Sequence, residues 1–209
     1  MPSPDWRAKR RAAALGDIVE MAWELAREHG LAGLSLRDLA RRLGMAAPSL
    51  YSYFDSKHAL YDALFADGYR AMLEMDPPAE GDDVRTTLRN VARFYMQFAL
   101  DDPVRYQLLS QRTIPGFEPS PEAYALAQEA YDWTAAPLRA VVDVTQGDLD
   151  LISAVITGLV SQQLANDPGG TRWVRLLDDA VDLLVHRLEQ RKTHPASPRG
   201  RRTRKKRNP

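Results

Sequence analysis

Apolar residues recur at helical spacing along almost the whole chain, and this periodicity constrains the fold more than any other feature. No window shows the alternation of β-branched and polar residues that is typical of a half-buried strand. Between the periodic stretches lie residues that end helices, such as Gly30, Gly44 and the pair Pro77-Pro78. The sequence therefore predicts an all-α fold.

Capping residues place the expected helices. Ser35 precedes Asp38 at the spacing of a capping box, and Ser56 precedes another periodic run, so both are predicted N-caps. Pro48 falls in the first turn of a short helix, where its missing N–H costs no hydrogen bond. We expect helices over residues 8–29, 36–42, 47–53, 57–75, 82–100, 103–112, 121–144, 148–166 and 171–192.

Composition argues against several classes of protein. The chain has no cysteine, which excludes disulfides, thiol catalysis and cysteine-ligated zinc. It has no long apolar run and no apolar signal segment, so we expect a cytoplasmic protein without a membrane span. No phosphate-binding loop or catalytic arrangement is present, and we expect no enzyme activity, no metal and no cofactor. The histidines are scattered without metal-ligand spacing, at His29, His58, His186 and His194.

The formal net charge is zero, but the charges are distributed unevenly. Residues 1–60 carry nine Lys/Arg and seven Asp/Glu, residues 61–186 carry nine and twenty, and residues 187–209 carry ten and one. An acidic middle between basic ends suggests two tasks on one chain. The basic ends are suited to a polyanion that the middle would repel.

Residues 43–57, LGMAAPSLYSYFDSK, place small residues directly ahead of three aromatics. With helix 36–42 and the Gly44 turn, this stretch has the layout of a helix-turn-helix, whose second helix enters the DNA major groove. Small residues let that helix approach the bases. Tyrosine hydroxyls reach phosphates, and Lys57 can share a phosphate with the N–H groups of the next helix start. Phe54 is expected to point into the core.

The segment GLSLRDLARRLGMAAPSLYSYFDSKHALYDAL resembles the DNA-binding domain of the TetR family of bacterial repressors. The resemblance covers about residues 10–65. Tyr53 is a departure, because most members have histidine there. The resemblance implies phosphate contacts for Ser35 and Lys57, base contacts for Arg37, Ala47, Pro48 and Ser49, and a clamp on the DNA backbone for Tyr51 and Tyr53.

Several of these residues also have a purely structural interpretation. Ser35 can act as a cap alone, Arg37 as a solvated helix charge, and Tyr51 as a packing residue. Arg37 is the only residue of the set with the planar donors that read a guanine edge. Loss of Arg37 should therefore relax specificity if it faces a base, and weaken all sequences equally if it faces a phosphate.

Helices 148–166 and 171–192 are apolar on more than one face. A surface helix needs only one apolar stripe, so each of these two is expected to pack its second face on a partner subunit. A fully internal helix pair in a monomer is the alternative. The resemblance to the TetR family favours a four-helix dimer interface, with candidate residues Ile152, Val155, Gly158, Leu159, Gln162, Trp173, Leu177, Ala180 and Leu184.

Aromatic residues crowd the helices between positions 82 and 144. Most are expected to be plain core, but the TetR resemblance implies that a subset lines a ligand cavity. Their abundance suggests a largely apolar effector, whose identity the sequence does not specify. The candidate pocket residues are Phe94, Tyr95, Phe98, Tyr106, Tyr124, Tyr131 and Trp133.

These features predict four parts. They are an arm with a helix-turn-helix domain (1–56), a connecting helix (57–78), a helical ligand-binding and dimerisation domain (79–193), and a basic tail (194–209) expected to be disordered for lack of apolar residues. The predicted function is a ligand-responsive transcription regulator, most often a repressor, that binds palindromic operator DNA as a homodimer. The alternative is an architectural, nucleoid-associated DNA-binding protein without a ligand, which uses the tail for coverage.

Overall fold

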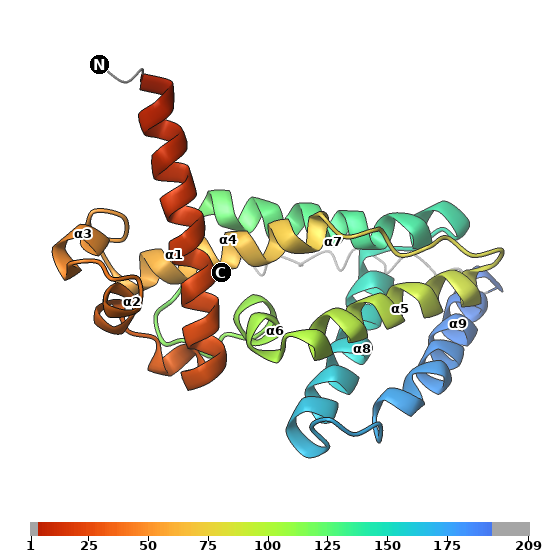
Figure 1. Cartoon of the computed structure of the whole chain (residues 1–209). Helices are drawn as coiled ribbons and strands as arrows, with labels where there is room; N and C mark the ends of the chain where they lie inside the picture. Colours follow the sequence, from red (N-terminus) through yellow and green to blue (C-terminus); the bar gives the residue numbers. More distant parts are fainter. Residues whose placement is uncertain (1–3, 194–209) are drawn as a thin grey trace, which may run out of the picture.

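The computed structural model describes residues 4–193, and within that range every regular element is helical, which confirms the all-α prediction. None of the described helices is both long and apolar enough to cross a membrane. The predicted tail, 194–209, lies outside the described residues. The elements are α1 (Pro4–Gly33), α2 (Leu36–Arg42), α3 (Ala47–Tyr51), α4 (Lys57–Leu73), α5 (Val84–Asp101), α6 (Pro103–Ser110), α7 (Pro121–Val141), α8 (Gln146–Asn166), the 3₁₀ helix η1 (Val174–Leu176) and α9 (Leu177–Thr193) (Figure 1).

The helix boundaries in the first third of the chain follow the local signals. Gly30 has φ 72° and breaks the regular helix of α1, and Gly44 has φ 62° in the turn between α2 and α3. Both angles lie in the left-handed region that glycine adopts at low cost. The Oγ of Ser35 accepts from the Asp38 N–H at 3.4 Å and the Oγ of Ser56 from the Ala59 N–H at 3.1 Å, so both predicted caps are confirmed.

The predicted helix over 171–192 is wrong at its start. Residues 167–176 form a turn and η1, and α9 begins only at Leu177. The side chain of Gln163 on α8 explains this start, because its Oε1 accepts from the backbone N–H of Trp173 at 2.9 Å and of Val174 at 3.3 Å. Its amide also donates to the carbonyl of Gly170 at 3.1 Å. A buried side chain from the preceding helix thus shapes this segment.

Other boundaries shift by a few residues. α1 begins at Pro4 rather than residue 8, and α3 ends at Tyr51 rather than residue 53. α8 begins two residues early because Thr145 and Asp148 form a reciprocal capping box, with the Thr145 N–H donating to Asp148 Oδ2 at 2.9 Å.

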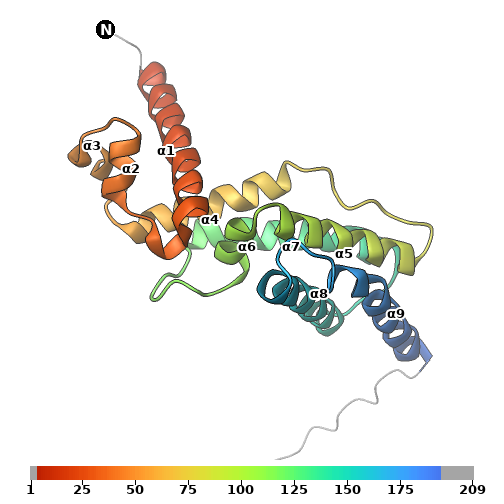
Figure 2. The same cartoon turned by 60° about the horizontal axis from the view of Figure 1, so that its bottom comes forward.

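The buried apolar side chains of the described residues form two separate cores. The first joins α1–α4 with α6 and the beginning of α7, around Leu39, Leu50 and Leu64. The second joins α5, the end of α7, α8 and α9, around Leu88 and Val181. α4 and α7 lie side by side across the boundary, and Figures 1 and 2 show α1–α3 at one end of the molecule and α8 and α9 at the other.

Candidate nucleic-acid interface

A buried leucine and a buried phenylalanine fix α3 in place. Leu50 is fully buried and Phe54 is 4% exposed, and both belong to the core that α1, α2 and α4 build. The predicted inward orientation of Phe54 is therefore confirmed. The turn before α3 is closed by the Met45 N–H, which donates to the Ala40 carbonyl at 2.9 Å. These contacts hold α3 rigidly against α2 and leave its other face to solvent.

The free face of the α2–α3 unit carries most of the predicted base-reading residues. Arg37, Pro48 and Ser49 are exposed, and Ala47 is half-buried against the core. Among the residues that the structure describes, Arg37 has no acidic partner. Its neighbours Arg41 and Arg42 are paired on the protein itself. An unpaired guanidinium next to a small-residue helix is available to a base or a phosphate.

Arg41 and Arg42 are engaged in ion pairs. Arg41 Nη2 lies 2.8 Å from Asp38 Oδ1, and Arg42 donates to both carboxylate oxygens of Glu28. The hydrogen bond from Arg42 lowers the pKa of Glu28. Exposed pairs of this kind contribute little to stability, but they direct the two guanidinium groups along the protein surface.

The two tyrosines differ in their surroundings. Tyr51 is 52% exposed at the end of α3, which leaves its hydroxyl free to reach outward. Tyr53 is half-buried, and the guanidinium of Arg11 lies 4.8 Å from its ring centroid. Arg11 Nη2 also donates to the Ser52 carbonyl at 3.1 Å. Arg11 from α1 therefore holds the segment that follows α3.

Lys57 has an internal partner that the sequence did not indicate. Its Nζ donates to the Ala32 carbonyl at 2.8 Å and lies 5.4 Å from the Tyr61 ring centroid. The ammonium thereby satisfies a carbonyl beyond the Gly30 break and joins α1 to the start of α4. It keeps two further N–H donors.

Residues 18–64 match the sequence model of bacterial regulatory proteins of the tetR family. Residues 18–64 therefore form a TetR-family DNA-binding domain. The chain is 33% identical over 112 residues to the HTH-type transcriptional regulator Rv1816 of Mycobacterium tuberculosis (strain ATCC 25618 / H37Rv), an alignment that covers 52% of this chain and 48% of that relative. The chain spans about half the length of these curated relatives.

Two solved structures extend the TetR-family likeness beyond the first domain. The solved structure of the protein SCO4313 has a TM-score of 0.65 at 26% identity, covering 89% of this chain and 100% of that one. A TetR variant from Acinetobacter baumannii AYE in complex with minocycline has a TM-score of 0.57 at 26% identity, covering 84% and 96%. Both the helix-turn-helix and the helical second domain therefore have the TetR architecture.

Within residues 4–193, polar contacts connect the DNA-binding end of the molecule to the rest of the chain. Asp102 is 8% exposed between α5 and α6, and its Oδ2 accepts from Arg27 Nε at 3.1 Å and Nη2 at 2.7 Å. Trp23 Nε1 donates to Asp67 Oδ2 at 2.8 Å, between α1 and α4. Ser120, the N-cap of α7, donates to Asp62 from its N–H at 2.6 Å and its hydroxyl at 2.8 Å. Of these roles, only the N-capping of α6 by Asp102 and of α7 by Ser120 has a signal in the sequence.

The aromatic residues predicted to line a ligand pocket separate into buried and exposed groups. Phe98 and Tyr106 are buried, Phe94 packs edge-on against Trp133 with ring centroids 5.5 Å apart, and Tyr95 packs against Tyr106. Burial raises the pKa of Tyr95. The other two point outward, since Tyr124 is 53% and Tyr131 36% exposed.

A groove of about 630 Å³ lies between α5 and the start of α9. Phe94 is the member of the predicted pocket set that lines it. Its walls are otherwise mostly thioether and aliphatic, with charged groups among them: Met75, Arg93, Phe94, Met96, Gln97, Leu100, Val174, Arg175, Leu177 and Asp178.

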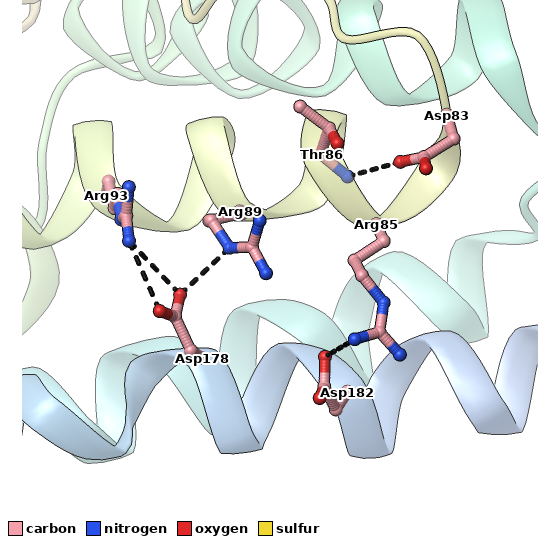
Figure 3. Close-up of polar contacts among 7 residues, drawn as sticks. All are labelled: Asp83, Arg85, Thr86, Arg89, Arg93, Asp178 and Asp182. Carbon is pink, nitrogen blue, oxygen red and sulfur yellow. Dashed lines mark hydrogen bonds and ion pairs between the residues drawn. The ribbon is translucent and has the colours of Figure 1, made fainter.

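Arginines of α5 pair with aspartates of α9, and the pair of Arg93 with Asp178 lines the groove (Figure 3). Asp178 lies 3.0 Å from Arg89 Nε and 3.2 Å from Arg93 Nη2, and Asp182 lies 2.8 Å from Arg85 Nη1. Asp83 caps α5 by accepting from the Thr86 N–H at 2.7 Å, and this hydrogen bond lowers the pKa of Asp83. The ion pairs fix α9 against α5.

The predicted dimer residues lie on two different faces of α8 and α9. Ile152, Leu177 and Leu184 are buried in this chain's own core, which corrects their assignment to a free surface. Gly158 and Gln162 are exposed. The half-buried members are Val155, Leu159, Trp173 and Ala180.

Two leucines outside the predicted dimer set extend the exposed face. Leu183 is 73% and Leu176 36% exposed. Their spacing of seven residues, with Ala180 between them, places all three on one side of the chain's final helical segment. This spacing is the signal from which they could have been found.

Proposed function

We propose that the protein is a ligand-responsive transcription regulator that binds palindromic operator DNA as a homodimer and is released by a small, largely apolar effector. The observation that carries the proposal is the exposed α2–α3 face in a TetR-family domain. Arg37, Pro48, Ser49 and Tyr51 are all exposed on elements that the core holds in place.

Base recognition is proposed for Arg37, Ala47, Pro48 and Ser49. Helix α3 has no Arg, Asn or Gln that could make a bidentate contact with a base. Apolar contact with thymine methyl groups and DNA shape therefore supply much of the readout. Arg37 on α2 is the strong hydrogen-bonding reader.

Backbone contact is proposed for Ser35, Tyr51, Tyr53 and Lys57. Tyr51 has the most exposed ring and a rigid reach to a phosphate. Lys57 uses one donor on Ala32 and offers the others to DNA. The bond from Lys57 to Ala32 pre-orients the ammonium, which lowers the entropy lost on binding.

Dimerisation is proposed through the apolar face that α8 and α9 leave uncovered. Leu151, Val155 and Leu159 are only half-buried on α8, and Leu183 is largely exposed on α9. Gly158 lies on the same face, and a Cβ built there meets no atom within 4 Å in the chain. A close approach of a second copy uses this open space, as isologous interfaces do.

Effector binding is proposed in the second domain. A relative of similar fold was crystallised with minocycline, and the groove beside α5 gives this chain a concave surface of suitable size. The effector would favour a dimer whose two α3 helices are wrongly spaced for the operator. It shifts that equilibrium only by its difference in affinity for the two states. The contacts of Asp102 and Asp62 are the direct links through which the domains would respond.

Capture of genomic DNA fragments by the purified protein tests this proposal. The expected result is a small number of enriched fragments, each protected over a short palindromic site in a footprint. Broad, strongly salt-sensitive coverage without a common sequence would contradict it and favour an architectural protein.

A further inference from the structure

The first turns of α1 stand apart from the body of the molecule. Figures 1 and 2 both show the N-terminal half of α1 projecting beyond the neighbouring helices on the side where α2 and α3 lie. From Trp6 to Asp17 every residue is exposed except Ala14, which is half-buried, and full burial begins at Ile18. This segment, residues 6–17, is called the α1 extension below.

The α1 extension presents its arginines on one face. Arg7, Arg10, Arg11 and Ala14 are spaced i, i+3, i+4 and i+7, which places them on one side of a helix. Arg11 identifies the direction of that side, because it donates to the Ser52 carbonyl and lies over the Tyr53 ring. The arginine face is thus turned toward the end of α3.

Two of the three arginines are free to meet a polyanion. Among the described residues Arg7 and Arg10 have no acidic partner, and the guanidinium of Arg10 lies 5.4 Å from the ring centroid of Trp6. The nearest acidic residue within the extension is Asp17, about two turns beyond Arg10. The face therefore carries a concentrated positive charge directly beside the candidate DNA-binding surface.

We propose that the α1 extension is a second DNA contact, in which Arg7 and Arg10 bind phosphates of the strand next to the groove that α3 enters. DNA is the expected partner because the positive charge of the arginine face complements its phosphates. The arginine face is also continuous with the exposed surface of α3. Arg11 is a positioning residue that fixes the extension to the segment after α3. This inference rests on the proposed function. The phosphate contacts would add a sequence-independent contribution to the affinity of the protein for its operator.

The test compares full-length wild-type protein with Arg7→Ala/Arg10→Ala on a duplex that the wild type selects from a randomised library. Affinity is measured by anisotropy across a salt series. Each phosphate contact contributes about 0.9 to the slope of log K against log [salt], so four contacts per dimer predict a slope that falls by about three to four. Hydroxyl-radical footprints should lose backbone protection while the selected base sequence stays the same.

Two matched variants sharpen the test. Arg7→Lys/Arg10→Lys keeps the charge and should keep most of the slope. Lys9→Ala removes a cation from about the opposite side of the helix and should leave the slope unchanged. The melting temperature should stay constant for all variants, because residues 7–10 are exposed.

The outcomes separate this inference from the proposed function. If the wild type selects no palindromic duplex, both the proposed function and this inference fail. If it selects one and the Arg7→Ala/Arg10→Ala protein shows the same slope and footprint, the extension is not a DNA contact. If Lys9→Ala reduced the salt slope as much per removed charge as Arg7→Ala/Arg10→Ala does, the DNA contact could not be assigned to the arginine face.

Discussion

The junction at Asp102 supports a quantitative prediction, because one carboxylate performs two separable tasks. Its Oδ1 accepts from the Arg105 N–H at 3.1 Å as the N-cap of α6, and its Oδ2 accepts from the two Arg27 nitrogens. Replacing an N-cap by alanine costs about 1 kcal/mol. A bond to a charged group contributes about 1.5–3 kcal/mol when buried.

The ion pair contributes less to stability than a fully buried pair, because the Arg27 side chain is partly exposed to solvent. Its side chain is 44% exposed against 11% for Asp102, so we expect only about 1 kcal/mol from the pair. Asp102→Ala loses both tasks and should cost about 2 kcal/mol, whereas Asp102→Asn keeps a capping oxygen and should cost about 1 kcal/mol. At about 2–4 °C per kcal/mol for a chain of this length, the melting temperatures should fall by about 4–8 °C and 2–4 °C.

Calorimetry on the two Asp102 variants, Arg27→Ala and the double variant Arg27→Ala/Asp102→Ala measures these terms. One protein concentration is kept throughout, because the proposed dimerisation would make the melting temperature depend on concentration. The coupling free energy between Arg27 and Asp102 should be about 1 kcal/mol. A coupling near zero, or an Asp102→Asn loss as large as that of Asp102→Ala, would refute the division of tasks.

Three further substitutions test the two proposed surfaces. Arg37→Ala should cost about 1–3 kcal/mol of operator binding and relax one base position, whereas equal weakening on all sequences in a binding-site selection would make Arg37 a phosphate contact. Tyr51→Phe should weaken operator binding in anisotropy with almost no change in melting temperature, because the ring is exposed, and a large loss of stability would return Tyr51 to a packing role. A side chain at position 158 has room within the chain, so Gly158→Glu should leave the helical content intact and give monomers in light scattering. Gly158→Ala is the control and should stay dimeric. A Gly158→Glu variant that stays dimeric would place the interface elsewhere.

A helix end could be predicted from the sequence where the residues that cause it lie close to it along the chain. Gly30, Gly44, Ser35 and Ser56 act through their own backbone or the next three residues, so the sequence was sufficient to place those ends. The start of α9 depends on Gln163, whose amide reaches residues ten and eleven positions ahead. Side-chain contacts of that kind leave no periodic signal.

The same distinction applies to the candidate sites. The inward orientation of Phe54, just after α3, could be predicted because Phe54 differs so clearly from Pro48 and Ser49 in hydrophobicity. Apolar periodicity indicated that α8 and α9 have two faces. It did not tell which leucines belong to the chain's own core, since that depends on how α5 packs on α9. The pairing of Arg27 with Asp102, which are 75 residues apart, likewise required the tertiary structure.

Sequence-specific DNA binding by the α2–α3 face is the central claim, and a competition experiment tests it most directly. The full-length protein is titrated with the palindromic duplex that it selects and with a scrambled duplex of the same composition, at one physiological salt concentration. Specific sites of DNA-binding proteins are typically bound about 10³-fold or more tightly than non-specific DNA. The account predicts a preference of at least that size, and affinities within about tenfold of each other would contradict it.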